Sequence, residues 1–451
     1  MSSISEKRIF NGALWTVGTY ALTVVLRFGS NVVLTRLVAP DVFGMVMIVT
    51  TLKIGMELLT DVGIGQSVVR NENADNVRFR YTAWTLQVLR SFLLCTLLLL
   101  ASFPLGAFYD VPPGILQLGA LTIMVLGSAS TVHYYMQRHM QLKKMNIFDL
   151  VCDIASIVLV LGFAYLSPTV WSIMVASVVA ALFRAATSYL LPGARNWFAW
   201  EGPYVREILS FGKWIFLSSM LVFLANSFDK LFLAQSVPLA VFGIYAIART
   251  ISELPATLVA RVSFQLVFPL ISANSGEVRA TMRRQVGPMR LKLLLVVAVG
   301  LALTVVLSDI AVGIIYDARY GEAGWMLALL LIASWFAILC TVNEYTMMGL
   351  GKPAYGVAGN IVKLLALVSL TPVGIHYLGL PGAILAIIAG EILRYFPVLR
   401  GQFAEGLSFV RQDLLLHLVF FSALALFLLL RFEIGYGTPF EAVSLPAWSR
   451  L

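Results

Sequence analysis

The sequence predicts an all-α protein that crosses a membrane many times, and three observations support this fold class. First, 59% of its 451 residues are hydrophobic and only 12% are charged, whereas soluble domains carry about 25% charged residues. Second, the apolar residues form blocks of roughly 20, the length that a helix needs to cross about 30 Å of hydrocarbon. Third, Lys and Arg residues gather in short breaks between these blocks. We therefore expect lipid to surround most of this chain.

Thirteen apolar blocks separated by polar breaks are expected to form transmembrane helices. In chain order they cover residues 12–35, 42–60, 82–107, 114–136, 147–167, 169–191, 208–235, 239–270, 291–316, 324–348, 355–377, 381–399 and 413–430. The first block has no small-residue cleavage site after a short apolar core, so we expect a retained helix rather than a signal peptide. After Phe432, the glycines and prolines of the tail predict a loose or interfacial end.

Basic residues fall in every second connection, and this pattern sets the expected topology. These connections carry Lys7 and Arg8; Arg70, Arg78 and Arg80; Arg138, Lys143 and Lys144; Arg195 and Arg206; Arg279, Arg283, Arg284, Arg290 and Lys292; Lys352; and Arg400 and Arg411. The opposite connections are short and carry mostly Asp110, or Asp317 with Arg319 and Glu322. The positive-inside rule then places the N-terminus in the cytoplasm, and it accounts for the net charge of +9 without a nucleic-acid partner.

An internal repeat divides the expected helices into two sets of six. Leu34–Gly44 (LTRLVAPDVFG) aligns with Leu233–Gly243 (LAQSVPLAVFG), and Phe108–Asp110 aligns with Ile315–Asp317 at nearly the same offset. Because each repeat holds an even number of helices, both run in the same direction about a pseudo-two-fold axis along the membrane normal. We expect an N-terminal lobe over residues 1–206, a C-terminal lobe over 207–400, and an extra helix with a tail over 401–451.

The candidate site residues are polar groups deep inside helices, where each charge costs roughly 2.5–3.5 kcal/mol to insert. They are Arg27 and Asn31 on the first helix, Lys53, Glu57 and Asp61 on the second, Asp229 and Lys230 on the seventh, and Arg249, Glu253 and Arg261 on the eighth. The repeat aligns Arg27 with Asn226 and Asn31 with Lys230. Two interpretations remain open. The i, i+4 pairs Lys53–Glu57 and Arg249–Glu253 only lower each other's insertion cost, or the four helices surround one aqueous central cavity.

Other polar residues are expected to have structural roles. Arg90, Arg184, Glu344, Lys363 and Arg394 lie near cytoplasmic helix ends, where long side chains reach the interface. Asp149 and Asp153 suit the N-terminal end of the fifth helix, and Pro255 is expected to kink or open the eighth helix.

The sequence lacks the spacing of catalytic or cofactor sites. Cys95, Cys152 and Cys340 lie in or near apolar blocks, and the four histidines are scattered without metal-ligand spacing. A Walker loop and a nucleophile elbow are also missing from the sequence. We therefore expect no catalytic residue, no metal and no cofactor.

The first third of the chain resembles the polysaccharide transporter family of Wzx-type flippases, within the multidrug, oligosaccharidyl-lipid and polysaccharide exporter superfamily. LTRLVAPDVFG, LLTDVGIGQSVVR (Leu58–Arg70) and FYDVPP (Phe108–Pro113) carry the resemblance. It is strongest over about residues 8–150 and extends over the first twelve helices. Many members of that family have twelve or fourteen helices, whereas this sequence predicts thirteen.

The resemblance implies two six-helix lobes around a V-shaped cavity, alternating access, and export of undecaprenyl-diphosphate-linked oligosaccharide repeat units to the periplasmic leaflet of a bacterial inner membrane. It implies that the anionic substrate is bound by Arg27, Asn31, Lys53, Lys230, Arg249 and Arg261. It further implies that Glu57, Asp61, Asp229 and Glu253 tune the field or carry a coupling proton or sodium ion. The implied partners are this glycan, membrane lipids, and the polymerase and chain-length regulator of the same surface or exopolysaccharide pathway.

Two alternative functions remain at this stage. A multidrug or toxic-compound cation antiporter of the same superfamily would need an acidic cavity with aromatic walls, whereas the intramembrane bases here outnumber the acids by five to four. A membrane enzyme, such as a repeat-unit polymerase or a glycosyltransferase, would need a large loop for its chemistry, and the longest break is about twenty residues.

Overall fold

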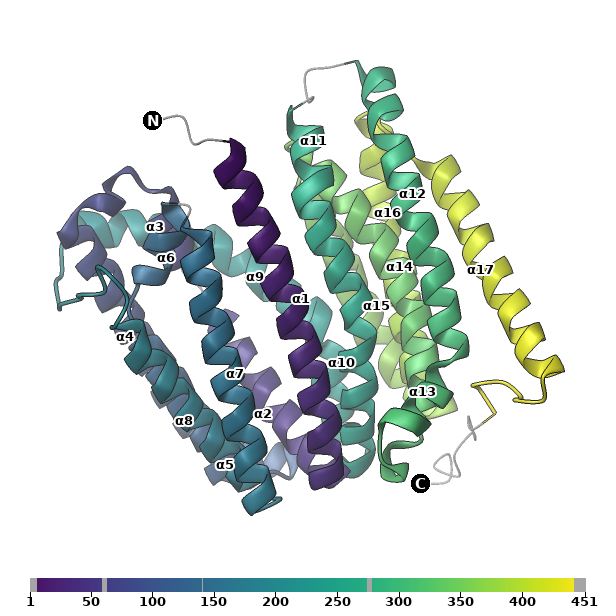
Figure 1. Ribbon diagram of the computed structural model, residues 1–451, viewed down its shortest axis with the longest axis horizontal. Coiled ribbons are helices and arrows are strands. Elements are labelled where there is room, and N and C mark those ends of the chain that lie inside the picture. The colour runs from purple at the N-terminus through teal and green to yellow at the C-terminus, as the bar shows by residue number, and fades with distance from the viewer. Residues whose placement is uncertain (1–5, 59–62, 140, 274–277, 442–451) are drawn as a thin grey trace. The chain divides into compact units, whose positions relative to one another are not determined.

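The computed structural model describes residues 6–58, 63–139, 141–273 and 278–441, which form helices joined by short connections (Figure 1). The chain divides into two compact units, Met1–Met220 (unit 1) and Leu221–Leu451 (unit 2). The boundary between these units and the expected lobe boundary at residues 206/207 both fall within the long helix α9, Gly202–Ser236. The lobe ranges themselves stay a prediction.

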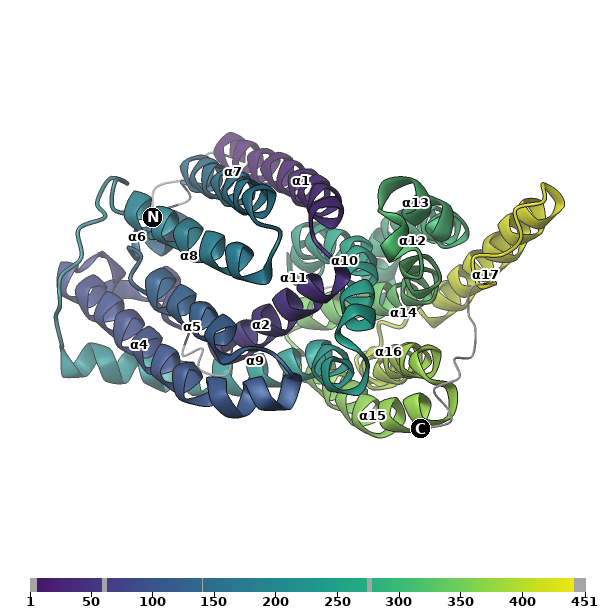
Figure 2. The same cartoon turned by 90° about the horizontal axis from the view of Figure 1, so that it is seen from below.

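Unit 1 is a bundle built around α5. Its elements are α1 (Glu6–Leu37), α2 (Pro40–Leu58), α3 (Ile64–Arg70), η1 (Glu72–Asp75), α4 (Val77–Tyr109), α5 (Pro113–Gly127), α6 (Val132–Arg138), α7 (Leu142–Leu166), α8 (Val170–Ser188) and the start of α9. The helix α5 contacts α2, α4 and α8, while α7 packs against α1 and α8 (Figure 2). Val205 and Ile208 pack with Ile64 and Phe79, which holds the start of α9 against α3 and α4.

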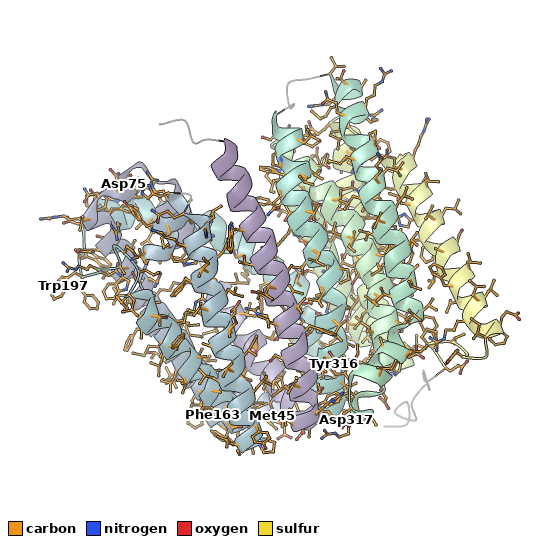
Figure 3. The ribbon with its side chains drawn as sticks, viewed as in Figure 1. Met45, Asp75, Phe163, Trp197, Tyr316 and Asp317 are labelled. Carbon is orange, nitrogen blue, oxygen red and sulfur yellow. The ribbon has the colours of Figure 1, made fainter. Side chains whose placement is uncertain are left out.

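The connections of unit 1 alternate between its two ends. Figure 3 shows Asp75 and Trp197 at one end of the unit, and Met45 and Phe163 at the opposite end. This alternation is the arrangement that successive membrane-crossing helices require.

Unit 2 is built around α14. Its elements are the rest of α9, α10 (Leu239–Val262), η2 (Ser263–Val267), α11 (Phe268–Ala273), α12 (Arg279–Val306), α13 (Ser308–Ile315), η3 (Ala318–Tyr320), α14 (Ala323–Gly349), α15 (Ala354–Leu378), α16 (Leu380–Ala404) and α17 (Val410–Glu433). Helix α14 contacts α10, α12, α13 and α16, and its side chains Trp335 and Cys340 are fully buried. Helix α17, which corresponds to the thirteenth predicted span, packs against α12 (Figure 1).

The packing order of unit 1 recurs in unit 2. In unit 1, α5 contacts α2, α4 and α8, and α7 packs on α8. In unit 2, α14 contacts α10, α12 and α16, and α15 packs on α16. The chain order of the equivalent helices is also the same. The predicted all-α fold with two six-helix lobes is therefore confirmed.

Each of the thirteen predicted ranges overlaps a helix. Within the part of the chain that the structure describes, nine helices are long and apolar enough to cross a membrane, or ten if α5 and α6, which are bent by 54°, form one span. The helices α1, α2 and α9 are not among these, and α2 carries Asp41, Lys53 and Glu57 within 19 residues. All three of these helices carry candidate charges.

The opening expected at Pro255 is not where the eighth helix becomes irregular. Helix α10 continues through Pro255 to Val262, because neighbouring groups in a bundle can compensate for the missing N–H. The irregular turn follows at Ser263–Val267, where the backbone forms a wider π-helical turn. Arg261 lies immediately before this turn.

Candidate functional site

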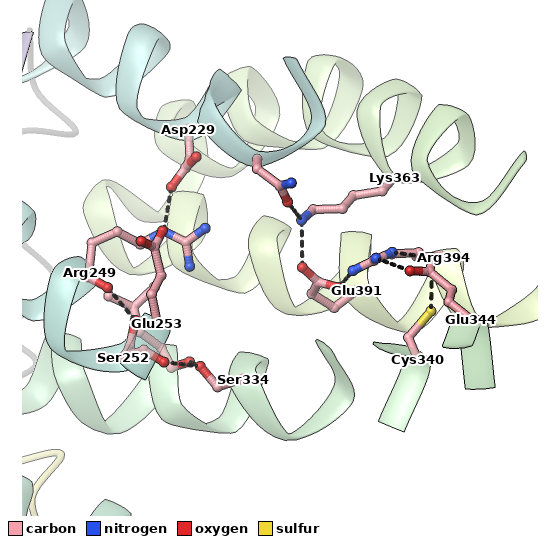
Figure 4. A network of polar contacts seen from close by, with 12 residues as sticks. Asp229, Arg249, Ser252, Glu253, Ser334, Cys340, Glu344, Lys363, Glu391 and Arg394 are labelled. Carbon is pink, nitrogen blue, oxygen red and sulfur yellow. Dashed lines mark hydrogen bonds and ion pairs between the residues drawn. The ribbon is translucent and has the colours of Figure 1, made fainter. Parts of the chain in front are cut away.

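A cluster of charged side chains joins α9 and α10 inside unit 2 (Figure 4). The Nε atom of Arg249 lies 2.9 Å from Oδ2 of Asp229 and 3.3 Å from Oε1 of Glu253. Lys230 Nζ donates a hydrogen bond of 3.0 Å to the same Glu253 oxygen. The Tyr245 hydroxyl donates to Asp229 Oδ2 at 2.5 Å. The carboxylates of Asp229 and Glu253 thereby connect α9 with two successive turns of α10.

A second cluster joins α14, α15 and α16. Lys363 Nζ lies 2.6 Å from Glu391 Oε1, and it also donates to Oδ1 of Asn226 on α9 at 2.8 Å. Arg394 donates to both carboxylate oxygens of Glu344, at 2.7 and 3.1 Å, and to Glu391 at 3.2 Å. Helix α9 therefore contacts both clusters, the first through Asp229 and Lys230 and the second through Asn226.

The two clusters together balance their formal charges. The bases are Lys230, Arg249, Lys363 and Arg394, and the acids are Asp229, Glu253, Glu344 and Glu391. Buried charges need such pairing because an unpaired ion in a low-dielectric interior costs several kcal/mol. The network opens to its surroundings at Glu253, whose side chain is 41% exposed, while Lys230 beside it is 15% exposed. The α10 end of this network is therefore its accessible edge.

Unit 1 holds its intramembrane charges differently. Arg27 on α1 forms an ion pair with Asp153 on α7, at 3.1 Å between Nη2 and Oδ1, yet 64% of the Arg27 side chain is exposed. On α2, Lys53 and Glu57 are half-buried, as is Asn31 on α1. Arg90 on α4 donates to the backbone carbonyl of Glu57 and so holds the end of α2.

The structure brings together part of the expected site. Asp229, Lys230, Arg249 and Glu253 meet in one network, and Arg249 and Glu253 form an i, i+4 ion pair at 3.3 Å, which was one of the two open interpretations. Arg261 is exposed near the far end of α10. The pairing of Lys53 with Glu57 stays a prediction, and Asp61 lies outside the described residues.

Sequence reasoning gave the wrong role to the charges on α14, α15 and α16. Glu344, Lys363 and Arg394 were expected to reach the membrane interface, but Lys363 and Arg394 are buried and paired within the network. The network also includes Glu391, which was not a candidate. The available signal was the pair Glu391 and Arg394, three residues apart in an apolar helix, which places acid and base on one face.

The same correction applies in unit 1. Helix α7 begins at Leu142, so Asp149 lies about two turns inside it, beyond the reach of the helix N-terminus. Asp149 instead pairs with Arg184 of α8, and Asp153 pairs with Arg27 of α1. Arg184 and Arg90 therefore bond within the bundle as well.

No group of three or more His, Cys, Asp or Glu side chains in the described part of the chain is arranged to hold a metal ion. The three cysteines are buried and unbridged.

Comparison with known proteins identifies the family. Residues 33–324 match the family model described as polysaccharide biosynthesis protein. The teichuronic acid biosynthesis protein TuaB of Bacillus subtilis is 23% identical over 373 residues, which cover 78% of this chain and 73% of TuaB.

Two solved structures share the fold. The lipid II flippase MurJ, in an inward closed conformation, matches with a TM-score of 0.71 at 11% identity, over 95% of this chain and 94% of MurJ. An inward-facing multidrug resistance MATE transporter of the MOP superfamily matches with a TM-score of 0.65 at 14% identity, over 85% of this chain and 94% of the transporter. The chain is a multi-pass membrane member of the polysaccharide biosynthesis protein family, with the two-lobed fold of the MOP-superfamily transporters.

Proposed function

We propose that this protein is a flippase that moves an undecaprenyl-diphosphate-linked oligosaccharide repeat unit from the cytoplasmic to the periplasmic leaflet by alternating access. Membership of the polysaccharide biosynthesis protein family supports the biosynthetic role. The fold shared with a lipid II flippase supports transport of a lipid-linked glycan. The basic residues in alternate connections support a cytoplasmic N-terminus in a bacterial inner membrane.

The observation that carries this proposal is the exposure of Arg27. This residue lies ten positions before the end of α1, about 15 Å along the helix axis, and 64% of its side chain is exposed. A guanidinium at this depth cannot face hydrocarbon without a large cost, so it must face water or an anion. A diphosphate matches the planar donor array of Arg, because charge-assisted hydrogen bonds to its oxygens replace the lost hydration.

Within each unit, the candidate residues take different roles in this proposal. In unit 1, Arg27, Asn31 and Lys53 supply donors to the anionic headgroup. In unit 2, Lys230 and Arg261 supply positive charge at accessible positions, whereas Arg249 is a positioning residue because its guanidinium is buried between Asp229 and Glu253.

The acidic candidates are proposed to carry the coupling ion, with Glu57 and Asp61 in unit 1 and Asp229 and Glu253 in unit 2. Glu253 is the most suitable of those described, because it is the most exposed acid of the network and forms ion pairs with two bases. Protonation of Glu253 would leave Lys230 and Arg249 with less negative charge beside them. Such a change would raise the positive field at the accessible edge of the network.

Substitution of Arg27 in cells tests the proposal. A strain lacking the chromosomal gene would carry the wild type, Arg27→Ala, Arg27→Lys, or the control Arg36→Ala on the same helix. We expect Arg27→Ala to abolish delivery of the glycan to the periplasm, Arg27→Lys to retain part of it, and Arg36→Ala to retain most of it. Membrane insertion would be checked by the amount of each variant in the inner-membrane fraction.

Normal surface glycan in the Arg27→Ala strain would contradict the proposed headgroup role. If the wild-type strain instead lost resistance to organic cations on deletion and kept its glycan, the multidrug antiporter would be the better assignment.

A further inference from the structure

A cavity of about 740 Å³ lies inside unit 1, bounded by side chains of α2 to α8. Pockets that hold small ligands have volumes of about 300–1,000 Å³, so this cavity is large enough for one. Residues of α3 and α6, which pack against each other, line one end of it. By the alternation of basic connections, this is the expected cytoplasmic end. We call it the unit 1 chamber.

The chamber lies where the fourth span is interrupted. Helix α5 ends at Gly127, α6 starts at Val132, and the two are bent by 54°. The Gln87 side chain of α4 donates to the backbone carbonyls of Gly127 and Ala129, at 2.8 and 3.0 Å. In membrane proteins, non-helical backbone is tolerated where it is covered by protein or lines a polar cavity. The interrupted segment therefore forms part of the chamber wall, and Gln87 of α4 hydrogen-bonds its free backbone carbonyls.

Close packing at Gly127 and Gly65 shows that this wall is built to a fixed shape. A Cβ atom at Gly127 would lie 1.7 Å from Ser91 Oγ, and one at Gly65 would lie 2.6 Å from Cε1 of Tyr134. Both glycines line the chamber. Because glycine has no side chain, α5 can approach α4 closely at Gly127, and α3 can approach α6 closely at Gly65.

Neutral hydrogen-bonding groups dominate the polar lining. The chamber is lined by the amides Gln66, Gln87 and Gln137 and by the hydroxyls Ser91, Ser130 and Ser188. Gln66 and Gln137 are exposed, and each offers two N–H donors and one carbonyl acceptor. Such a lining can both donate and accept, which matches the hydroxyl groups of a sugar.

The charges of the chamber wall cancel, which argues against an anionic ligand. Arg90 and Arg184 line it together with Glu57, and Arg184 is paired with Asp149 directly behind the wall. The Arg90 guanidinium already donates to the Glu57 carbonyl. Glu57 in the lining and Asp149 behind it thus offset the two arginines, and His133, which also lines the chamber, lies 3.8 Å from the same Asp149. The wall therefore lacks the surplus of positive charge that a phosphate group would need.

Two rings give the chamber an apolar face. Tyr134 of α6 and Phe148 of α7 line it beside the polar groups. A pyranose ring has one edge of hydroxyls and one face of C–H groups, so it needs both kinds of surface. Aromatic faces supply large apolar contact area with little loss of side-chain freedom.

We infer that the unit 1 chamber binds a neutral sugar residue of the transported glycan on the cytoplasmic side. The inference rests on the proposed function, because that function supplies the glycan. In this proposal the chamber binds the sugar, whereas other residues of unit 1, Arg27, Asn31 and Lys53, bind the lipid diphosphate. Selectivity for the repeat unit would then depend on residues that do not contact the headgroup.

Transport kinetics test this inference on the full chain reconstituted in vesicles, with the host's own lipid-linked glycan, radiolabelled in its sugars, as the probe. We expect the double variant Gln66→Leu/Gln137→Leu to raise the half-saturating glycan concentration about tenfold, because two hydrogen bonds are lost. The maximal rate should stay within about twofold of the wild type. The matched control Gln141→Leu, an exposed glutamine outside the chamber, should change neither value.

An unchanged half-saturating concentration in the double variant would overturn the inference. So would a loss confined to the maximal rate, which would indicate a structural role for these glutamines. If the wild type itself failed to transport the glycan, the proposed function would be wrong. Normal wild-type transport with no shift in the double variant would refute the chamber alone.

Photo-crosslinking gives a second measurement that does not depend on transport. A benzophenone amino acid at position 137 should capture the sugar-labelled glycan, whereas the same group at the exposed position 158 of α7 should capture several-fold less. Monosaccharides released from the glycan by acid should compete for capture at position 137, and inorganic pyrophosphate should not. Competition by pyrophosphate alone would assign the chamber to an anion and overturn the inference.

Discussion

Units 1 and 2 share a packing order but treat their intramembrane charges in opposite ways. In unit 2, Lys363 and Glu391 are buried in a network whose four bases and four acids balance. In unit 1, the Arg27 side chain is mostly exposed, and a chamber of about 740 Å³ stays open. The repeat aligns Arg27 with Asn226. The Asn226 side chain is neutral, and its Oδ1 atom accepts a hydrogen bond from Lys363.

This difference indicates that equivalent positions of the repeat differ in role, stabilising the bundle in unit 2 and contacting a ligand in unit 1. The unit 2 charges fix five helices relative to one another, because each buried ion needs its partner. In unit 1, the Arg27 side chain pairs with Asp153 yet stays 64% exposed, so part of its guanidinium can contact a ligand. The largest effects on stability should therefore come from unit 2, and effects on the substrate without loss of stability should come from unit 1.

The largest expected effect is the loss of Lys363. In Lys363→Met the buried Glu391 carboxylate keeps Arg394 but loses Lys363 as a partner. This change should destabilise the protein by about 3–5 kcal/mol. Thermal unfolding of the purified protein in detergent would measure this as a lower Tm. Adding Glu391→Gln should recover more than half of the loss, since the unpaired charge is then removed. A single variant with an unchanged Tm would contradict the closed network.

A smaller loss is expected at the wall of the unit 1 chamber. Gly127→Ala places a methyl group against Ser91 and should cost about 1–3 kcal/mol by overpacking. Ser91→Gly in the same chain should restore stability, because it removes the atoms that the new Cβ would meet. Gly162→Ala on α7 is the matched control, since nothing lies within 4 Å of its Cβ position. If all three variants unfolded alike, the close approach of α4 and α5 would be wrong.

Arg27→Met should destabilise the protein less than Lys363→Met does, because 64% of the Arg27 side chain is exposed whereas Lys363 is buried. Some loss is expected, since Asp153, which is 18% exposed, loses its partner. The same variant should lose delivery of the glycan to the periplasm. Measuring Tm and delivery together separates this outcome from that of Lys363→Met, where delivery is lost through unfolding. A large fall in Tm for Arg27→Met would place Arg27 with the structural charges.

The smallest expected effect lies outside the spans, at Asp75 in the connection before α4. Burial works slightly to raise the pKa of its carboxyl, but the hydrogen bond with His139 at 3.0 Å and the charge of Arg138 outweigh it and lower that pKa below 3.8. A lowered pKa means that the contribution to stability is present above pH of about 4 and is lost as the pH falls further.

Asp75→Asn should therefore lower Tm slightly at neutral pH, by the equivalent of less than about 1 kcal/mol for an exposed pair. The difference from the wild type should disappear as the pH falls below about 4. A difference that instead grew at low pH would contradict the sign of the pKa shift.

The fold was largely predictable because hydrocarbon thickness imposes one length on every span, and each predicted block overlaps a helix. The repeat was also predictable, since its turns conserve local sequence such as Val42–Gly44 and Val241–Gly243. The interruption between Gly127 and Val132 was not predicted. Ser128, Ser130 and Thr131 interrupt the apolar residues only briefly, and hydropathy alone cannot register a bend.

The site was predictable only where partners are close in sequence. Arg249 and Glu253 are one turn apart, so their pairing follows from helix periodicity. Lys363 meets Asn226 and Glu391 from other helices, and such contacts depend on which helix faces pack together. Distance from a helix end favoured an interfacial Lys363, but tertiary packing buries it.

The central claim, translocation of a lipid-linked glycan, is tested most directly by purified wild-type protein in vesicles that carry a radiolabelled undecaprenyl-diphosphate-linked repeat unit in both leaflets. A glycosidase added outside would remove label only from the outer leaflet. We expect about half of the label to be lost without protein and nearly all of it with protein, because inner-leaflet glycan would be carried outward. Loss of only half of the label in both preparations would contradict the claim.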